Sequence, residues 1–174
     1  SMDWSWGLLD KSEQAFLQQL SVFAGGWTLD SAQAVCDTDV LGLTNALVKK
    51  SLIVVKQDEG RETRYRFHEI VRQYAHEKLL AVGESEIIRD RHLAHFVKLA
   101  IQAEPELYRA NRASWLKKLR DELDNLRLAL KWALATDTAS GLRLIVASWD
   151  FWLASDDVGE LEVRLMQLLE RYKK

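Results

Sequence analysis

Apolar residues recur at helical spacing along most of the chain, and the first three such segments each follow a residue that can cap a helix. Asp10 and Glu13 form a capping-box pattern that opens a first helix. We expect this helix to end at Gly25-Gly26, because glycine accepts the left-handed conformation that follows helix ends. Thr28 is expected to cap a short second helix and Asp39 a third. The apolar positions of the first helix are Ala15, Phe16, Leu20 and Phe23.

The pattern changes to the two-residue period of a strand after the third helix. Leu52–Val55 is a compact β-branched run, and Asp58–Gly60 is a turn signal. In Arg64–Phe67, charged and aromatic residues alternate, which is typical of a half-buried strand. Three helices followed by a β-hairpin predict a winged-helix domain over residues 1–83.

Everything after the hairpin has helical spacing. One helix is expected from His68 to Leu80 with Gly83 closing it, and a second from Ser85. The second should stop near Glu104, because Pro105 disfavours the helical conformation in the residue before it.

The longest helix is expected to follow Asn111, because its leucines step by three or four. Thr138 should begin another helix that runs through Trp152, and Asp156 or Asp157 the last. These helices predict an antiparallel α-helical, TPR-like array over residues 84–174, which is too short to test the repeat period of about 34 residues. The fold class is therefore mainly α. The stepping leucines are Leu116, Leu119, Leu123, Leu126 and Leu130.

Composition and charge narrow the class of protein. Of the 174 residues, 48% are apolar and 29% charged, and only one is proline, which excludes a disordered or collagen-like chain. No run reaches the roughly 18 apolar residues of a membrane helix, and we infer no secretion leader. The single Cys36 fits a reducing compartment, so we expect a cytoplasmic protein. Ser1 precedes Met2, which suggests a piece of a longer protein.

The charge balance argues against a nucleic-acid partner. The 24 basic and 26 acidic residues give a net charge of −2, and neither half of the chain has the basic excess that neutralising phosphates requires.

Several segments taken together resemble one family of regulators. They are Leu20–Trp27, Leu47–Leu52, Arg64–Ala75, Arg91-His92 and Glu122–Arg127. In this order they resemble bacterial AfsR/MalT-like, LuxR-type regulators of the STAND class of signal-transduction ATPases. In these proteins a P-loop nucleotide module is followed by a winged helix and then by a helical-repeat sensor.

The resemblance implies a regulatory and coupling role without catalysis. In the family, exchange of ADP for ATP lets the winged helix swing out after an inducer binds. This chain lacks the G-x-x-x-x-G-K-S/T phosphate cradle. ADP or ATP, with Mg²⁺, would therefore be held by an N-terminal nucleotide-binding domain of the same chain. The helical repeats would bind an inducer or a partner protein.

His68 is the sharpest candidate site. Phe67-His68-Glu69 aligns with the Met-His-Asp motif of related switches, in which the histidine reaches the β-phosphate of ADP. Phe and Glu replace Met and Asp here. A histidine at a helix N-terminus can donate an N–H to phosphate, although a surface or packing role is the alternative.

Two other functional readings remain open. A winged-helix DNA-binding module would read bases with its third helix, but Asp37 and Asp39 at the start of that helix would repel phosphate, so we expect no direct DNA contact. A helical-repeat scaffold that binds a partner protein is the other reading. The residues available for DNA are Thr44, Asn45, Lys49 and Lys50 on the helix and Arg61, Arg64 and Arg66 as possible wing contacts.

The remaining reactive residues do not form a catalytic or metal site. His92 and His95 lie three apart on one helix, and no third ligand is obvious. Cys36 lies on an apolar helix face and is expected to be buried filler. The tryptophans of the second half, Trp115, Trp132, Trp149 and Trp152, are expected either to pack in the core or to line a groove for a ligand or partner helix.

Overall fold

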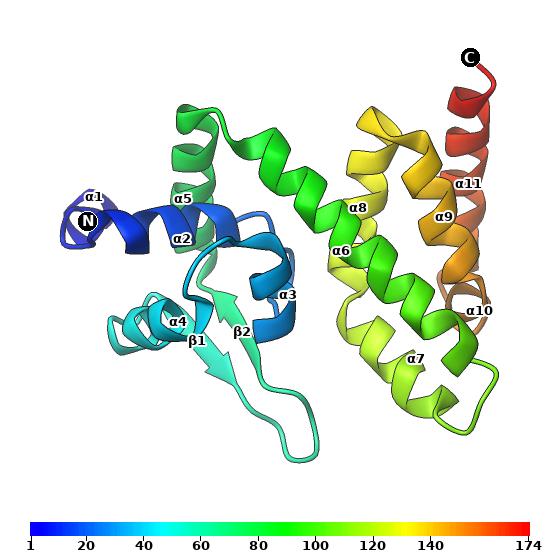
Figure 1. Ribbon diagram of the computed structural model, residues 1–174, viewed down its shortest axis with the longest axis horizontal. Helices are drawn as coiled ribbons and strands as arrows, with labels where there is room; N and C mark the ends of the chain where they lie inside the picture. The colour runs from blue at the N-terminus through cyan, green and yellow to red at the C-terminus, as the bar shows by residue number, and fades with distance from the viewer. The chain divides into compact units, whose positions relative to one another are not determined.

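The computed structural model describes residues 1–174, which divide into a winged-helix unit, Ser1–His92, and a helical unit, Leu93–Lys174 (Figure 1). The expected mainly α fold with one small antiparallel hairpin is confirmed. The division falls inside a long helix, α6, which begins in the first unit and ends in the second. The first unit contains α1 (Met2–Gly7), α2 (Lys11–Leu20), α3 (Leu29–Val35), α4 (Val40–Lys49), β1 (Ile53–Lys56), β2 (Arg64–Phe67), α5 (Glu69–Val82) and the start of α6 (Ser85–Glu106).

Side-chain caps fix the starts of α2, α3 and α4 as the sequence predicts. Asp10 accepts from the backbone N–H of Glu13 at 2.8 Å, and Asp39 accepts from that of Gly42 at 3.2 Å. At α3, the Thr28 and Ser31 side chains each accept from the other's backbone N–H in a reciprocal capping box. These bonds satisfy donors that the first turn of a helix leaves unpaired.

The end of the first predicted helix is corrected. α2 ends at Leu20 rather than at Gly25-Gly26, and the chain leaves the helix there so that Val22 and Phe23 enter the core. Gly26 instead allows a close approach to β2. It has φ +102°, and a Cβ at this position would lie 2.5 Å from the carbonyl oxygen of Tyr65.

This approach adds a third segment beside the hairpin. β1 and β2 pair from Ile53 opposite Phe67 to Lys56 opposite Arg64. Trp27 then forms a bridge to Tyr65, with each backbone N–H donating to the other's carbonyl at 2.9 and 2.8 Å. The buried Trp27 ring packs against Phe67 at 4.7 Å between centroids, so the hairpin is held against the helices by aromatic contacts.

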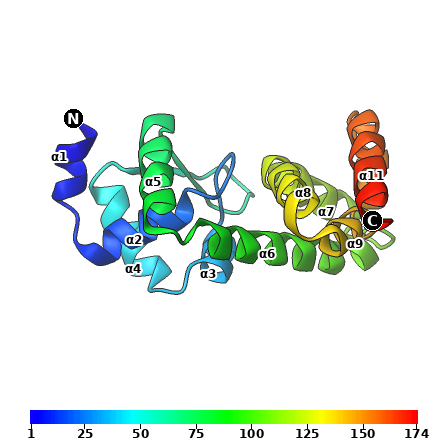
Figure 2. The ribbon, with the colours of Figure 1, turned by 90° about the horizontal axis from the view of Figure 1, so that it is seen from above.

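The helices of the winged-helix unit enclose one apolar core. α5 packs against α2, and α4 lies against both α2 and β1 (Figures 1 and 2). The Lys50 ammonium donates to both oxygens of the buried Glu13 carboxylate, at 2.7 and 2.9 Å. This ion pair holds the C-terminal end of α4 against α2. The fully buried side chains include Phe16, Leu17, Leu20, Phe23, Trp27, Leu47 and Leu79.

α1 is a short helix that the sequence pattern did not predict. Its Trp6 ring contacts Tyr74 of α5 at 5.4 Å, and the Tyr74 hydroxyl donates to the Asp3 carboxylate. The short helix is therefore attached to α5 by side chains, and none of its own residues is buried.

The helical unit contains more breaks than the leucine spacing predicts. Besides the end of α6 it comprises α7 (Arg112–Asp121), α8 (Leu123–Thr136), α9 (Thr138–Ala147), α10 (Trp149–Leu153) and α11 (Val158–Tyr172). α6, with 22 residues, is the longest helix, and it continues through Pro105 to Glu106 rather than stopping at Glu104. A proline in the last turn costs little, because the exposed residue four positions earlier, Ile101, can leave its carbonyl to water.

The single long helix expected after Asn111 is two helices. The Asn111 side chain does not cap α7, and the chain bends at Glu122. The buried Glu122 carboxylate accepts from the side-chain amide of Asn125 at 2.9 Å, so this polar pair is satisfied inside the unit. The leucine stripe continues across the bend and hides it from the sequence pattern.

The helix predicted from Thr138 through Trp152 is also interrupted. α9 begins at Thr138 as predicted, with Asp137 as its side-chain cap, but Ser148 separates α9 from α10. The Ser148 hydroxyl donates to the Leu144 carbonyl at 2.6 Å and accepts from the Trp152 indole at 3.0 Å. Trp152 is thereby buried with its polar atom satisfied, whereas Trp149 is partly exposed.

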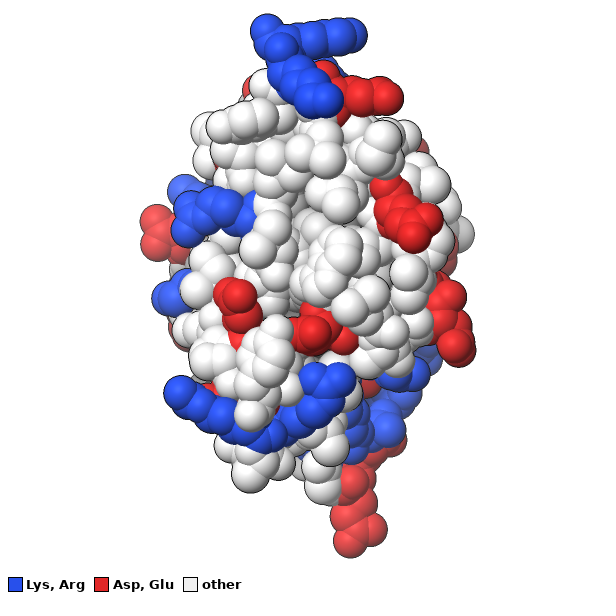
Figure 3. All heavy atoms as spheres, turned by 90° about the vertical axis from the view of Figure 1, so that its right-hand side faces the viewer, with Lys and Arg blue, Asp and Glu red and all other residues white.

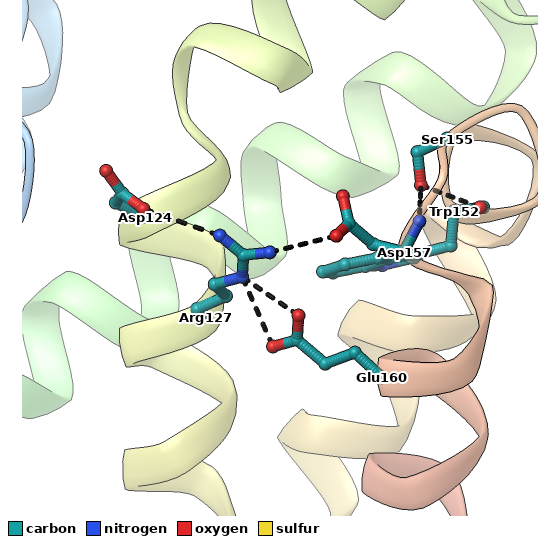
Figure 4. A network of polar contacts seen from close by, with 6 residues as sticks. All are labelled: Asp124, Arg127, Trp152, Ser155, Asp157 and Glu160. Carbon is teal, nitrogen blue, oxygen red and sulfur yellow. Dashed lines mark hydrogen bonds and ion pairs between the residues drawn. The ribbon is translucent and has the colours of Figure 1, made fainter.

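α8, α9 and α11 pack against one another as the core of the helical unit (Figure 1). Gly141 of α9 permits this, because a Cβ there would lie 2.8 Å from Leu168 of α11 and 3.0 Å from Ala133 of α8. The Arg127 guanidinium joins α8 to the start of α11, donating to Glu160 at 3.0 Å and to Asp157 at 3.1 Å (Figure 4). The carboxylate of Asp124, one turn earlier on α8, lies 3.6 Å from the same guanidinium and completes the network.

Candidate functional site

His68 lies where the hairpin ends and α5 begins. It is the N-cap residue of α5 with an extended backbone, and its carbonyl accepts the first helical hydrogen bonds, from Val71 and Arg72. Its side chain is exposed and caps none of the α5 backbone. The imidazole is therefore available to an external group beside the positive end of a 14-residue helix dipole.

The residue that follows His68 is tied to its own helix. The Glu69 carboxylate accepts from the Arg72 guanidinium at 2.9 Å, and this bond lowers the pKa of Glu69. Glu69 thus stays ionised and partnered, and the free hydrogen-bonding group at the start of α5 is the His68 ring.

The wing arginines do not form one cluster. Arg64 and Arg66 are two residues apart on β2, so they share one face of the strand, while Tyr65 points into the core. Arg61 lies in the turn between the strands. The Asp58 carboxylate is 3.8 Å from the Arg61 guanidinium and 3.9 Å from the Lys56 ammonium. Acidic Asp58 thus offsets much of the positive charge at the tip of the wing.

α4, which is the third of the helices predicted from the sequence, offers fewer free polar groups than its sequence suggests. Thr44 is fully buried, and Lys50 is held by Glu13. Of the four predicted readers, Asn45 and Lys49 are exposed and carry no ion pair with another element, whereas Lys50 is exposed but paired. At the N-terminal end, Leu41 is 58% exposed and Asp39 already occupies the backbone N–H of Gly42. A DNA phosphate would meet a carboxylate there instead of an open donor.

The other reactive residues are part of the core. The Cys36 thiol is buried, and desolvation raises its pKa to about 12, so it carries no thiolate near neutral pH. His92 is buried with its ring 5.4 Å from that of Phe23. No three His, Cys, Asp or Glu side chains come together in a group that could hold a metal ion.

One pocket near the helix-turn-helix has no counterpart in the sequence reading. It has a volume of about 260 Å³ and lies between α2 and the turn that joins α3 to α4. Gln19 lines it, and the amide oxygen of this residue is buried without a hydrogen-bond partner. No motif marks it, because its lining comes from two segments that only the fold brings together: Lys11, Ser12, Ala15, Phe16, Gln19, Asp37 and Thr38.

Comparison with known proteins agrees with this geometry. Residues 9–80 match the family model described as a winged helix-turn-helix domain, so the first unit is a winged helix by sequence and by structure. A candidate HTH-type transcriptional regulator of Mycobacterium tuberculosis strain H37Rv is 37% identical over 139 residues, and so is its counterpart in Mycobacterium bovis. These matches cover 76% of this chain and 15% of the relatives.

A second set of relatives matches a shorter stretch. An uncharacterised protein of M. tuberculosis is 42% identical over 102 residues, which is 55% of this chain and 26% of that protein. The chain therefore spans only a small part of the curated relatives it matches. No solved structure gives a significant match. No helix combines the length and apolar character needed to cross a membrane.

Proposed function

We propose that this chain is the regulatory and coupling segment of a nucleotide-switched transcriptional regulator of the STAND type. In this proposal the winged-helix unit docks on a nucleotide-binding domain of the same polypeptide, and the helical unit is the start of a TPR-like sensor array. Rigid-body motion of the winged helix then relays the binding of an inducer or partner protein. The segment itself carries out no catalysis.

The observation that carries the proposal is the position of His68. An exposed imidazole with no internal partner, at the N-terminus of α5, is suited to donate an N–H to a phosphate held by a neighbouring domain. This chain offers one such contact and no glycine-rich cradle. It would therefore complete an ADP or ATP site, with its Mg²⁺, rather than form one.

The surface of α4 supports coupling over DNA recognition. Base-reading side chains normally project from the N-terminal part of this helix. Here that part exposes Leu41 and the carboxylates of Asp37 and Asp39. An apolar and acidic surface suits contact with protein better than contact with a phosphate backbone.

Nucleotide release from the parent protein tests this role. We expect His68→Ala to speed ADP dissociation by about tenfold or more, because hydrogen bonds to charged groups contribute about 1.5–3 kcal/mol. Stopped-flow release of a fluorescent ADP analogue measures the rate. Glu77→Ala, an exposed substitution farther along α5, is the matched control and should leave the rate unchanged. An unaltered off-rate in His68→Ala would refute the nucleotide contact.

Direct DNA binding is the second candidate function. It is favoured by the match to the winged helix-turn-helix family and by the names of the mycobacterial relatives. Asn45 and Lys49 on α4 and Arg66 on the wing are the exposed groups that would carry it.

A further inference from the structure

We propose that the pocket between α2 and the turn that joins α3 to α4 binds a small zwitterion of the α-amino acid class. The carboxylate of the ligand would face Lys11, and its ammonium group would face Asp37 and the Gln19 amide oxygen. This inference goes beyond the proposed function and does not rest on it, because the site lies inside the winged-helix unit.

One wall of the pocket is a stripe along α2. Lys11, Ala15 and Gln19 line it at intervals of four residues, so they lie on one side of the helix. The buried ring of Phe16 lines it as well. Lys11 and Ala15 are exposed, so a ligand can enter from solvent. This wall therefore offers an ammonium group, an apolar surface and an amide.

The other wall is the turn before α4. α3 ends at Val35 and α4 begins at Val40, and Asp37 and Thr38 of the intervening turn line the pocket. Asp39 of the same turn is already occupied as the cap of α4. The turn therefore contributes one uncommitted carboxylate and one hydroxyl to the pocket.

The two charges of the pocket have no partner within the chain. Neither Lys11 nor Asp37 forms an ion pair or a side-chain hydrogen bond, whereas Lys50 and Glu13 of the same unit pair with each other. Charged side chains on an open surface, such as those that Figure 3 shows on the helical unit, project into solvent. Lys11 and Asp37 instead line the same recess. A lone anion would be repelled by Asp37 and a lone cation by Lys11, so a ligand with both charges is the complementary one.

An unsatisfied acceptor indicates what the positive end of the ligand is. The Gln19 amide oxygen is buried and has no hydrogen-bond partner, although buried polar atoms are normally paired. Because Gln19 lines the pocket, a donor that enters the pocket can reach this residue. A primary ammonium group has three N–H donors, which is enough for the Asp37 carboxylate and the Gln19 oxygen together.

The volume of the pocket limits the size of the ligand. Water occupies about 30 Å³ per molecule in the liquid, so a pocket of about 260 Å³ accommodates about nine non-hydrogen atoms. This is the size of a small amino acid such as valine. Its apolar side chain would contact Ala15 and Phe16, which lie between Lys11 and Gln19 in the sequence of α2.

Titration with L-valine, followed by the backbone amide NMR signals of the 174-residue chain, tests the binding. We expect saturable shifts in residues 11–19 and 37–38, with a Kd on the order of millimolar, because the ligand is small and the pocket is open to solvent. Isobutylamine and isovalerate keep the branched carbon skeleton of valine, and each lacks one of its charges. Both should bind about tenfold or more weakly than valine.

Two variants test the role of each charge. Lys11→Met and Asp37→Asn should each weaken valine binding by about tenfold, since each removes one charge and nearly keeps the shape of the side chain. Both residues are exposed, so the fold should be retained, which circular dichroism checks. Lys49→Met, an exposed substitution on α4 outside the pocket, is the matched control and should leave the affinity unchanged.

Three results would overturn the inference. The first is the absence of saturable shifts up to about 100 mM valine. The second is equal affinity for valine, isobutylamine and isovalerate, and the third is unchanged affinity in both variants, because binding would then not depend on the two charges. None of these measurements involves nucleotide, so their outcome is independent of the His68 experiment.

Discussion

Gly26 decides how the helices meet the wing. Its positive φ and the nearby Tyr65 carbonyl leave no room for a side chain, and the Trp27–Tyr65 bridge depends on this close approach. In the sequence, the Gly25-Gly26 pair resembles a helix stop. Only the fold reveals that the second glycine serves a contact with a strand almost forty residues away in the chain.

We therefore expect Gly26→Ala to destabilise the protein by about 2–3 kcal/mol, since the new Cβ is strained by the backbone conformation and collides with a backbone oxygen. Urea unfolding followed by circular dichroism measures the loss. Gly7→Ala, at a helical glycine with nothing within 4 Å of its Cβ position, should instead be neutral or slightly stabilising. Equal effects of the two substitutions would show that the close approach is not required.

The reactivity of the Cys36 thiol tests whether this single residue is buried. Burial raises its pKa from 9.0 to about 12, so the folded protein should show almost no reaction with a disulfide reagent between pH 7 and 9. A free thiol would gain reactivity steeply across that range, because its thiolate fraction increases. Absorbance of the released thiol in native buffer and in urea measures the difference. Fast native labelling would place Cys36 at the surface.

At the level of elements, Arg127 is the main polar link between α8 and the start of α11. It contacts three carboxylates, those of Asp124, Asp157 and Glu160 (Figure 4). The arginine is about one-third exposed, so water screens the network and its net contribution is modest. The network holds the start of α11 against α8, because the Asp157 side chain contacts Arg127 and does not cap its own helix.

We expect Arg127→Ala to lower the free energy of unfolding by about 1 kcal/mol, because three carboxylates then lose their shared cation. The loss should shrink in 1 M salt, where screening weakens both the attraction and the remaining repulsion. Arg109→Ala, which removes one exposed pair with Glu106, is the control and should change stability by less than about 0.5 kcal/mol. A salt-independent loss in Arg127→Ala would point to lost packing instead.

At the scale of the whole molecule, charge limits what the chain can bind. Its net charge is −2, and Lys50, at the end of α4, forms an ion pair with the buried Glu13. The cations that remain on α4 and the wing alternate with Asp37, Asp39 and Asp58. Such a surface lacks the concentrated positive potential that holds a protein on DNA.

We expect no gel shift of random duplex DNA by this chain, even at about 50 mM salt, where phosphate contacts are strongest. Retardation that disappears in Lys49→Ala and Arg66→Ala, but not in Lys117→Ala of the helical unit, would establish the DNA-binding alternative instead. The experiment separates the two candidate functions without requiring the parent protein.

The amino-acid sequence by itself determined the local features of this protein. The caps at Asp10, Thr28 and Asp39, the turn at Asp58–Gly60 and the strand Arg64–Phe67 depend on side chains within a few residues of one another. For that reason short-range patterns were sufficient to predict them. The order of three helices and a hairpin followed from these elements and predicted the winged helix.

Only the tertiary structure decided where the helices are interrupted and which polar side chains are exposed. The bends at Glu122 and Ser148 are stabilised by buried polar contacts that interrupt no leucine stripe. Likewise, the burial of Thr44 and the pairing of Lys50 with Glu13 are set by the packing of elements that are separate in the chain. Periodicity reports which side of a helix is apolar, whereas packing between elements determines which polar groups remain free to act.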